Sequence, residues 1–499
     1  MTGTFAGDYA GLVFNRQVQV PAPVRSTTLQ QLLEQLEGEF QLPGPFSAPV
    51  LAAAERAVAE LAPAPEDHTD LPFFTLDPAT STDLDQAMHL SETATGYRIH
   101  YAIADVPALV ELGGVLDAAT RQRGQTIYLP HRRIPLHPEV IGEDHGSLLP
   151  GRPRRAFIWV LDLDAEGQLR HTALHRSMIR SRAKRDYLTA QQQLDSGAPD
   201  AQLVLLQRIG RLRISQEARR RGASLNLPEQ DVQVDTHGNY TLVSRTPLPV
   251  EDYNAQISLL TGMAAAELML QHKVGILRTM PPPRPEDLAE FRMQSRVLGH
   301  RWEEHLDYGQ FLRTLDVCDP AQLVLMHRAA ALFRGADYQV INGQPDTELV
   351  QAALAAPYAH ATAPLRRLVD RFVLLTCHLL CRQRPIPQPL LEALEELPGL
   401  MRTSSAEAAA AGRASIALIE AWVLQHRVGE HFDAVVLTAA TANGQGKLRP
   451  GQVQLLGEAI TGSFTDSAPA ASLVSVRLEE ADPLTRRCRF SQAASKVTP

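Results

Sequence analysis

The sequence predicts an α+β multidomain protein in three parts: a small helical module at residues 1–64, a central domain at 65–427, and a β-barrel of the OB type at 428–499. Three observations predict this architecture. Two short helical patterns precede a linker, strand-like segments are followed by helical ones in the centre, and short strands return at the end. A length of 499 residues also corresponds to about three domains.

The N-terminal module contains two short helices. Ser26 can cap the first one, in which leucines recur at three-to-four spacing until Gly38 stops the helix. Ser47 and Pro49 then open the second helix. Such a pair could be a helix-turn-helix that contacts nucleic acid or a plain helical pair, and the sequence leaves both open. Residues 62–68, APAPEDH, are typical of a linker.

The central domain starts with strands and continues with helices. Short runs of strand composition, bounded by turns, lie at residues 73–76, 87–90, 97–104 and 157–163. From about residue 197 the apolar spacing becomes helical, and it predicts helices at 204–221, 255–271, 285–298, 320–333, 365–381 and 405–426. Cys377 and Cys381 lie in one of these apolar helices, which favours buried core thiols.

The last segment returns to strands, at residues 432–438, 452–456, 459–463, 473–478 and 487–490. About five strands in a tail of roughly seventy residues indicate a small OB-type barrel, an architecture that commonly binds oligonucleotides. The alternative is a β appendage without a role in RNA binding. Six basic residues favour the first interpretation: Lys447, Arg449, Arg477, Arg486, Arg487 and Arg489.

The composition limits the class of protein. Hydrophobic residues make up 44 % and charged residues 21 %, and the net charge of −8 means that nucleic acid would be bound by local basic surfaces. The four cysteines lack zinc-finger spacing and suit a reducing cytoplasm. The N-terminus lacks the order of a signal peptide, and the longest apolar run is too short to cross a bilayer. We therefore expect a cytoplasmic protein without membrane contact, and a monomer, because no heptad pattern is sustained.

The most informative segment is FFTLDPATSTDLDQAMHL at residues 73–90. A strand ends at Asp77, and Pro78 begins a turn. Asp83 and Asp85 follow two residues apart, which in an extended chain places both carboxylates on one face, and the turn can bring Asp77 back toward them. Converging acids repel one another unless a cation such as Mg²⁺ lies between them. The alternative is that Asp77 and Asp83 cap turns while Asp85 is solvated, and the spacing alone leaves both open.

The residues around these acids resemble the catalytic domain of the ribonuclease II / ribonuclease R family, the RNB family. Its signature, roughly T-x-D-x-x-x-x-x-D-x-D-D-A, stands here as Thr75, Asp77, Asp83, Asp85, Gln86 and Ala87. Further blocks follow in the family's order: IHYAIADV at 99–106, GQTIYLPHRRIPLHPEVI at 124–141, SLLPG at 147–151, SMIRSRAKRDY at 177–187 and APYAHATAPLRR at 356–367. The resemblance covers about residues 69–427 and implies an RNB-type catalytic domain of strands and helices, followed by an S1-type OB barrel.

The resemblance implies a processive, hydrolytic 3′-to-5′ exoribonuclease. Such enzymes thread single-stranded RNA down a narrow channel to a Mg²⁺ site, where Mn²⁺ can substitute, and release nucleoside 5′-monophosphates. By position, Asp77, Asp83 and Asp85 would hold the metal, and Gln86 would offer it a carbonyl oxygen. Arg366 would contact the scissile phosphate, and Tyr128 would stack on the terminal bases. The further residues that would contact RNA are Arg132, Arg180, Lys184, Pro282 and Arg367.

Structural alternatives stay open for some of these residues. Tyr128, which lies between two apolar residues, could belong to the core. Arg366 or Arg367 could pair with Asp370 on the same helix. Basic residues near the matching blocks would line the channel and draw the RNA backbone inward. These are Arg132, Arg133, Arg152, Arg154, Arg155, Arg180, Arg182, Lys184 and Arg185.

The chain departs from the family pattern in three places. Gln86 stands where the family has a fourth aspartate, which predicts weaker metal binding. The segment RTMPPPRP at 278–285 offers Pro282 where ribonuclease II enzymes have a clamping phenylalanine. Only 76 residues precede Asp77, too few for the two cold-shock barrels that the family usually carries. A catalytically weakened RNA-binding relative is therefore the main alternative function, and a nuclease that acts on DNA or within a strand is a third.

Overall fold

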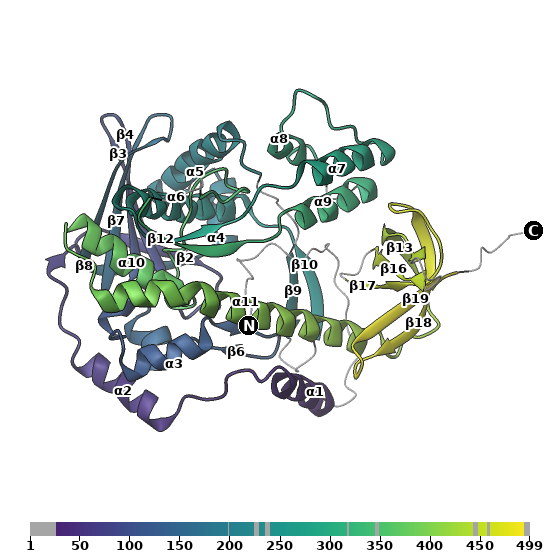
Figure 1. Ribbon diagram of the computed structural model, residues 1–499, viewed down its shortest axis with the longest axis horizontal. Coiled ribbons are helices and arrows are strands. Elements are labelled where there is room, and N and C mark those ends of the chain that lie inside the picture. Colours follow the sequence, from purple (N-terminus) through teal and green to yellow (C-terminus); the bar gives the residue numbers. More distant parts are fainter. Residues whose placement is uncertain are drawn as a thin grey trace, which may run out of the picture.

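The computed structural model describes residues 26–493 apart from 198, 224–228, 235–239, 317–318, 345–348, 443–447 and 457–459. Helices α1 (Ser26–Glu39) and α2 (Ala48–Ala59) lead into a large body of strands and helices, and a small β-barrel follows (Figure 1). This is the predicted α+β architecture with a terminal barrel.

The centre of the large body is one curled β-sheet. Its strands lie in the order β1-β8-β2-β3-β4-β7, and β8 (Leu169–Asp186) also pairs with β7 (Pro153–Asp164), so the sheet closes on itself. The larger part of β8 runs antiparallel to β7, and its last residues run parallel to β2 (Phe73–Asp77). The remaining strands are β1 (Glu66–Asp67), β3 (Gln86–Thr93) and β4 (Gly96–Ala104).

Helices cover the sheet and share one apolar core with it. α6 (Pro249–His272) packs against α10 (Leu368–Cys381), and both contribute buried side chains to a cluster that includes Phe157 and Trp159 of β7. α5 (Ala201–Arg219) also contributes Leu203 and Leu206 to this core, whereas Val232 of β9 (Glu229–Val234) and Leu242 of β10 (Tyr240–Arg245) join the barrel core. The other elements of the body are η1 (Val106–Ala108), α3 (Val115–Arg123), the β5–β6 hairpin (Ile127–Tyr128 and Arg133–Ile134), η2 (Val140–His145) and α4 (Tyr187–Asp195).

A helical lobe extends from the body on a two-stranded ribbon, β11 (Val274–Thr279) with β12 (Asp337–Asn342). Its core gathers aromatic rings, and Trp302 stacks on Phe311 with ring centroids 5.3 Å apart. The lobe consists of α7 (Pro285–Val297), α8 (Tyr308–Leu312) and α9 (Pro320–Leu332).

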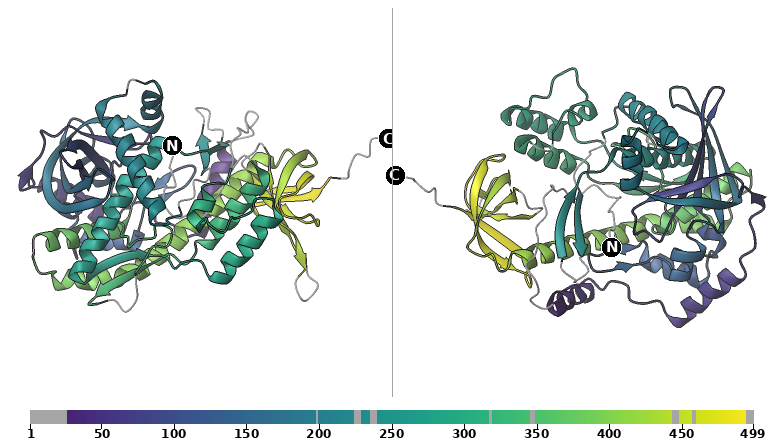
Figure 2. Two further views of the ribbon diagram at one scale, coloured as in Figure 1. Left: turned by 90° about the horizontal axis from the view of Figure 1, so that it is seen from above. Right: turned by 180° about the vertical axis from the view of Figure 1, so that it is seen from behind.

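Helix α11 (Gln388–Leu424) joins the body to the barrel, as all views show (Figure 1, Figure 2). Its first part contributes Leu390 and Leu394 to the main core, and its end contributes Ile419 and Leu424 to the barrel core. The barrel is closed in the order β13-β16-β17-β19-β18. Its strands are β13 (His431–Thr438), β16 (Gly451–Leu455), β17 (Thr461–Phe464), β18 (Leu473–Asp482) and β19 (Arg487–Gln492), and a short pair, β14 (Thr441–Ala442) with β15 (Leu448–Arg449), lies beside them.

The two N-terminal helices do not form one packed pair. α1 lies on α11, where its leucines contact Leu418, whereas α2 lies on α3 and η2. Among the described residues these two helices share no hydrophobic cluster. A helix-turn-helix needs its helices packed together, so that interpretation is wrong for this module.

The predicted strands and helices of the central domain are largely present, and several further elements were not predicted, among them α3, α4, β11 and β12. β8 is the longest described strand and is absent from the predicted ones, because its basic residues obscure the alternation of buried ones such as Ile179 and Ser181. α11 begins at Gln388 instead of residue 405. Cys377 is fully buried, as predicted, whereas Cys381 is only half-buried, and Cys318 and Lys447 lie outside the described residues. None of the described helices has the length and apolarity that crossing a membrane requires.

Candidate active site

Strand β2 carries Asp77 at its end, where the chain turns. In this turn the Ser81 N–H donates to the Pro78 carbonyl (3.0 Å). The Lys184 ammonium on the neighbouring strand β8 donates to the carbonyls of Ala79 (2.6 Å) and Ser81 (2.7 Å). These bonds fix the path of the chain away from Asp77.

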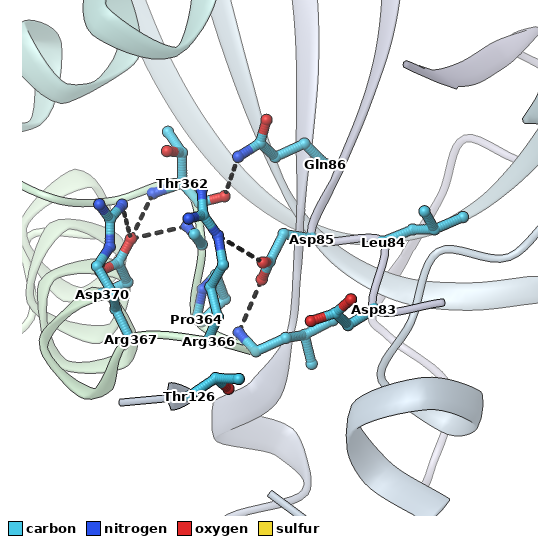
Figure 3. Close-up of polar contacts among 12 residues, drawn as sticks. Asp83, Leu84, Asp85, Gln86, Thr126, Thr362, Pro364, Arg366, Arg367 and Asp370 are labelled. Carbon is cyan, nitrogen blue, oxygen red and sulfur yellow. Dashed lines mark hydrogen bonds and ion pairs between the residues drawn. The ribbon is translucent and has the colours of Figure 1, made fainter. Parts of the chain in front are cut away.

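The segment after the turn is extended, and its carboxylates lie on one side. Figure 3 shows Asp83 and Asp85 on one side of the chain and Leu84 directed to the other. Leu84 is fully buried, and its N–H donates to Ser147 Oγ (2.9 Å). Asp85 is 4 % exposed, and its Oδ1 accepts from the backbone N–H of Leu365 (2.7 Å). The alternation that the spacing predicts is therefore present.

Arg366 faces Asp85 from the loop that leads into α10 (Figure 3). Its Nε lies 3.6 Å from Asp85 Oδ2. The loop is held by Asp370, whose Oδ1 accepts from the backbone N–H groups of Thr362 (2.9 Å) and Ala363 (2.7 Å). Because Asp370 is completely buried in the first turn of α10, the arginine loop is fixed to the helix.

The β5–β6 hairpin brings Tyr128 to the same place. Just before the hairpin, the Thr126 N–H donates to the Arg366 carbonyl (2.9 Å), which ties the hairpin to the arginine loop. The Tyr128 hydroxyl donates to Asp83 Oδ2 (3.4 Å). Three segments that are distant in the sequence therefore meet at one site.

Helix α1 holds the tip of this hairpin. Glu37 accepts hydrogen bonds from Arg132 Nε (2.7 Å) and lies 2.7 Å from His131 Nε2. Two residues later in the same helix, Glu39 pairs with Arg486 on the turn between β18 and β19 (2.8 Å). We call these contacts of Glu37 and Glu39 the α1 clasp, because they join the hairpin and the barrel through one helix.

Burial disfavours the ionised form of two of the three carboxylates. It raises the pKa of Asp77 from 3.8 to about 7, against the opposing charge of Arg366 and with a further contribution from Asp83. Burial also raises the pKa of Asp85, again against Arg366 and together with Asp83. Within the described part of the chain, Asp77 Oδ2 is buried without a hydrogen-bond partner. The negative charge of Asp83 thus adds to the effect of burial on the pKa of both other aspartates.

The acids are not arranged as a finished metal site. Among the described residues, no three His, Cys, Asp or Glu side chains are grouped to hold a metal ion. Instead, Arg133 Nη1 lies 2.6 Å from Asp83 Oδ1, and Arg366 pairs with Asp85. The donors nevertheless suit a hard divalent cation, because Asp77 has an unpartnered buried oxygen and is close enough to Asp83 for its charge to matter. Asp77, Asp83 and Asp85 are the residues that would hold Mg²⁺.

Comparison with known sequence families places this site in a defined context. The RNB domain matches residues 66–383, more than half of the chain, and the RNase II-type exonuclease C-terminal S1 domain matches residues 430–493. The chain belongs to the RNB domain family.

Relatives of this RNB protein include active and inactive nucleases by name. It is 32 % identical to Exoribonuclease 2 of Edwardsiella piscicida over 220 residues, which cover 42 % of this chain and 34 % of that protein. It is 29 % identical to the inactive exonuclease DIS3L2 of Arabidopsis thaliana over 338 residues, or 61 % and 32 % of the two chains. The chain thus spans about a third of the length of these curated relatives.

A solved structure shares the fold. Mycoplasma genitalium RNase R in complex with ribose-methylated single-stranded RNA superposes with a TM-score of 0.83. The two chains are 18 % identical, and the match covers 94 % of this RNB protein and 78 % of RNase R. Body and barrel therefore belong to one shared architecture.

Gln86 does not join the carboxylates of the RNB protein. Its Nε2 donates to the Thr362 carbonyl (2.7 Å), and its Oε1 accepts from the Tyr101 hydroxyl (2.6 Å). Figure 3 shows the amide extended toward Thr362 and away from Asp83. The prediction of Gln86 as a metal ligand is corrected by this geometry, since the residue after Asp85 in an extended strand points to the opposite face.

Arg367 is paired within the protein. Both Nε and Nη2 lie 3.0 Å from the carboxylate oxygens of Asp370, and the arginine side chain is only 15 % exposed. Arg367 thus forms the ion pair with Asp370 that was the alternative left open by the sequence, and its RNA contact stays a prediction. Arg366, in contrast, points to Asp85.

The other predicted RNA contacts are placed in different ways. Arg132 is engaged by Glu37, and Lys184 by the carbonyls of the turn after β2. Arg180 is half-buried on β8, and within the described chain its Nε has no hydrogen-bond partner. Pro282 is exposed in the connection between β11 and α7.

Several arginines predicted to line a channel are paired with acids. Arg154 lies 2.8 Å from Asp144, and Arg155 lies 3.1 Å from Asp105, which is completely buried as a side chain. Their charges are partly used inside the protein, so the local positive surface is smaller than the sequence predicts.

Arg133 is the site residue whose role the sequence analysis missed. It appeared there only among many basic residues, although in the hairpin it is the register partner of Tyr128. The hairpin was the available signal: pairing across its short turn places Arg133 beside whatever Tyr128 approaches.

Proposed function

We propose that this RNB protein is a metal-dependent exoribonuclease that degrades single-stranded RNA processively from its 3′ end to nucleoside 5′-monophosphates. The observation that carries the proposal is the convergence of the three aspartates with Arg366 and Tyr128 from three separate segments. Burying incompletely neutralised carboxylates costs stability, and such an arrangement is typical of a functional site.

The chemistry follows from the charges at the site. In hydrolysis, a water oxygen attacks the phosphorus while the bond to the 3′ oxygen of the preceding nucleotide breaks, which releases a 5′-monophosphate and leaves a new 3′ hydroxyl. When bound, Mg²⁺ supplies a means to orient water and to stabilise charge on the phosphate. Arg366 can donate to a phosphate oxygen, and its fixed loop keeps the guanidinium in place for that contact.

Tyr128 supports action at the end of a strand. Its ring lies beside the carboxylates, and its hydroxyl contact with Asp83 fixes the distance between the ring and the acids. A base stacked on this ring would lie next to the phosphate being cleaved. Stacking is available to every base, which suits degradation without sequence preference.

The barrel and the relatives support RNA as the substrate. The S1-type barrel belongs to a fold that commonly binds oligonucleotides. Exoribonuclease 2 bears the activity in its name, and RNase R has been solved in complex with single-stranded RNA. We extend both properties to this chain as part of the proposal.

The first test is a time course on a 5′-labelled single-stranded RNA with Mg²⁺ or with a chelator. We expect direct accumulation of a short labelled end product and release of monophosphates with Mg²⁺ only. A circular RNA of the same sequence is the control, and it should stay intact. Cleavage of the circle would show an endonuclease, and degradation of the linear RNA under chelator would overturn the metal dependence.

A catalytically weakened RNA-binding protein is the second candidate. It is favoured by the engagement of Gln86 with Thr362 and Tyr101 at the position of the family's fourth aspartate, and by the arginine pairing of Asp83 and Asp85. A mobility shift of intact RNA on a native gel, with no product in either lane of the time course, would establish this function instead.

A further inference from the structure

Asp83 is fully engaged by side chains of the protein itself. Arg133 Nη1 lies 2.6 Å from its Oδ1, and the Tyr128 hydroxyl donates to its Oδ2 (3.4 Å). The Asp83 and Arg133 side chains are 14 % and 21 % exposed, so this pair is shielded from most of the solvent. Both oxygens of Asp83 therefore have partners in the metal-free protein, and a new cation would have to displace one of them.

Arg133 has a second anionic partner on its other side. Its Nη2 pairs with Glu143 of η2, and it also approaches Thr82 Oγ1 (3.3 Å). Thr82 Oγ1 in turn donates to Glu143 Oε2 (2.7 Å). The guanidinium thus lies between two carboxylates, and Glu143 is held in position whether or not Asp83 is bound.

Two of the three aspartates have an arginine partner, whereas no arginine pairs with Asp77 among the described residues. Arg133 pairs with Asp83 and Arg366 pairs with Asp85, while Asp77 keeps a buried oxygen without a hydrogen-bond partner in the described chain. A guanidinium stays protonated at any physiological pH, so Arg133 cannot leave Asp83 by losing a proton. It can leave by breaking the contact with Asp83 and keeping its existing pair with Glu143.

We propose that Arg133 is a resident counter-cation that competes with the divalent metal for Asp83, and that Glu143 receives the guanidinium when the metal binds. This inference rests on the proposed function, because it concerns the metal of that reaction. Arg133 acts through Asp83 and is therefore a positioning residue. In the metal-free protein the charge of Arg133 balances that of Asp83, and because the metal must displace this arginine, its affinity is lowered.

The test is a titration of the full chain with Mn²⁺ in the absence of RNA, followed by calorimetry or by the spin resonance of free Mn²⁺. Arg133→Gln should bind Mn²⁺ about tenfold more tightly than the wild type, a difference of about 1.4 kcal/mol. Glu143→Gln should bind it several-fold more weakly, because the guanidinium then has Asp83 as its main partner. In the double variant the effect of Glu143→Gln should vanish.

Matched variants test whether Arg133 competes with the metal for Asp83 or only holds the Asp83 side chain in place. Arg132→Gln removes the neighbouring arginine, which pairs with Glu37, and should leave the Mn²⁺ affinity unchanged. Arg133→Lys keeps the charge and should bind nearly as the wild type does. Unchanged or weaker binding by Arg133→Gln, with circular dichroism showing a folded protein, would overturn the proposal. If Arg133→Gln does not fold, the Mn²⁺ affinity of Glu143→Gln decides. Affinity equal to or tighter than that of the wild type would overturn the proposal.

Asp85→Asn distinguishes this inference from the proposed function. Mn²⁺ binding that the wild type shows and Asp85→Asn loses establishes the metal site, whatever Arg133 does. Mn²⁺ binding by neither the wild type nor Arg133→Gln would overturn both the competition and the metal dependence of the proposed reaction.

Discussion

Asp85 combines deep burial with two fixed partners, a backbone N–H of Leu365 and the Arg366 guanidinium. Asparagine has the same shape, and its carbonyl oxygen can still accept from Leu365. Asp85→Asn should therefore keep the fold and RNA binding but lose turnover by at least about 100-fold, the usual scale for removing one charge-stabilising group. Gel time courses and fluorescence anisotropy with labelled RNA measure the two effects, and equal loss of both would contradict the role given to Asp85.

Tyr128 should control where degradation stops. Loss of its ring removes a stacking contact worth roughly 1–3 kcal/mol per base, so Tyr128→Ala should release a longer limit product. Tyr128→Phe keeps the ring and loses only the hydroxyl contact with Asp83. Its product should have the wild-type length, as read on a sequencing gel. A wild-type limit product from Tyr128→Ala would show that the ring does not hold the terminal bases.

Asp77 should make the metal-free protein sensitive to pH. Its pKa is about 7 in the fold against an ordinary value of 3.8, so the native state holds this proton more tightly than the unfolded state. The free energy of unfolding therefore loses a contribution as pH rises from about 4 to 7, at most a few kcal/mol at about 1.4 kcal/mol per unit. Asp77→Asn removes this loss.

Thermal unfolding of both proteins in chelator, at pH 5 and pH 8, checks the effect of Asp77. The stability of Asp77→Asn relative to the wild type should be greater at pH 8 than at pH 5. Comparing the two proteins removes the influence of buried histidines such as His137, whose pKa is lowered to about 3 mainly by burial. A constant difference across pH would contradict the raised pKa of Asp77.

The positions of some site residues could be predicted from the sequence and those of others could not. The face shared by Asp83 and Asp85 was predictable, because alternation in an extended chain is a local property. The same alternation turns Gln86 to the opposite face, but its bonding partners Tyr101 and Thr362 could not be predicted, because they are 15 and 276 residues away in the chain. Arg367 had both interpretations open, and only the fold selected the pair with Asp370.

At the scale of elements, the α1 clasp should stabilise the hairpin that carries Tyr128. Glu37→Ala leaves His131 and Arg132 without their carboxylate, a loss of about 1–2 kcal/mol for charged hydrogen bonds of this kind. Amide hydrogen exchange at residues 127–134 should become faster. Glu39→Ala, on the same helix, removes only the pair with Arg486 and should leave that hairpin protected. Equal protection in Glu37→Ala would show that the clasp does not hold the hairpin.

Most elements of the central domain were predictable, because apolar spacing follows the helical or extended period directly. The long strand β8 was not, since arginines and a lysine fill its partly buried positions and find acids in other segments, as Arg176 does with Asp105. The packing of α1 and α2 could not be predicted either, because α1 packs on α11 and α2 packs on α3 and η2, all of which follow later in the sequence. Contacts of that range leave no local pattern.

At the scale of the whole molecule, α11 should make the body and the barrel unfold together. The same helix contributes Leu394 to the main core and Leu424 to the barrel core. Ala409 is exposed near its middle, and Ala409→Pro would break the helix there at a cost of about 3 kcal/mol. We expect one calorimetric transition for the wild type and two for this variant. Ala409→Gln keeps the helix and should show one, and two transitions in the wild type would contradict the coupling.

The α1 clasp also bears on how the chain is made. A ribosome delivers α1 before the body and the barrel, yet Glu39 pairs with Arg486 over a separation of 447 residues, and the leucines of α1 contact Leu418. α1 therefore lacks these two partners until nearly all of the described chain has been synthesised. Glu37 can fasten the hairpin beside the carboxylates firmly only after that. The hairpin that carries Tyr128 therefore gains its support from Glu37 only when synthesis of the described chain is nearly complete.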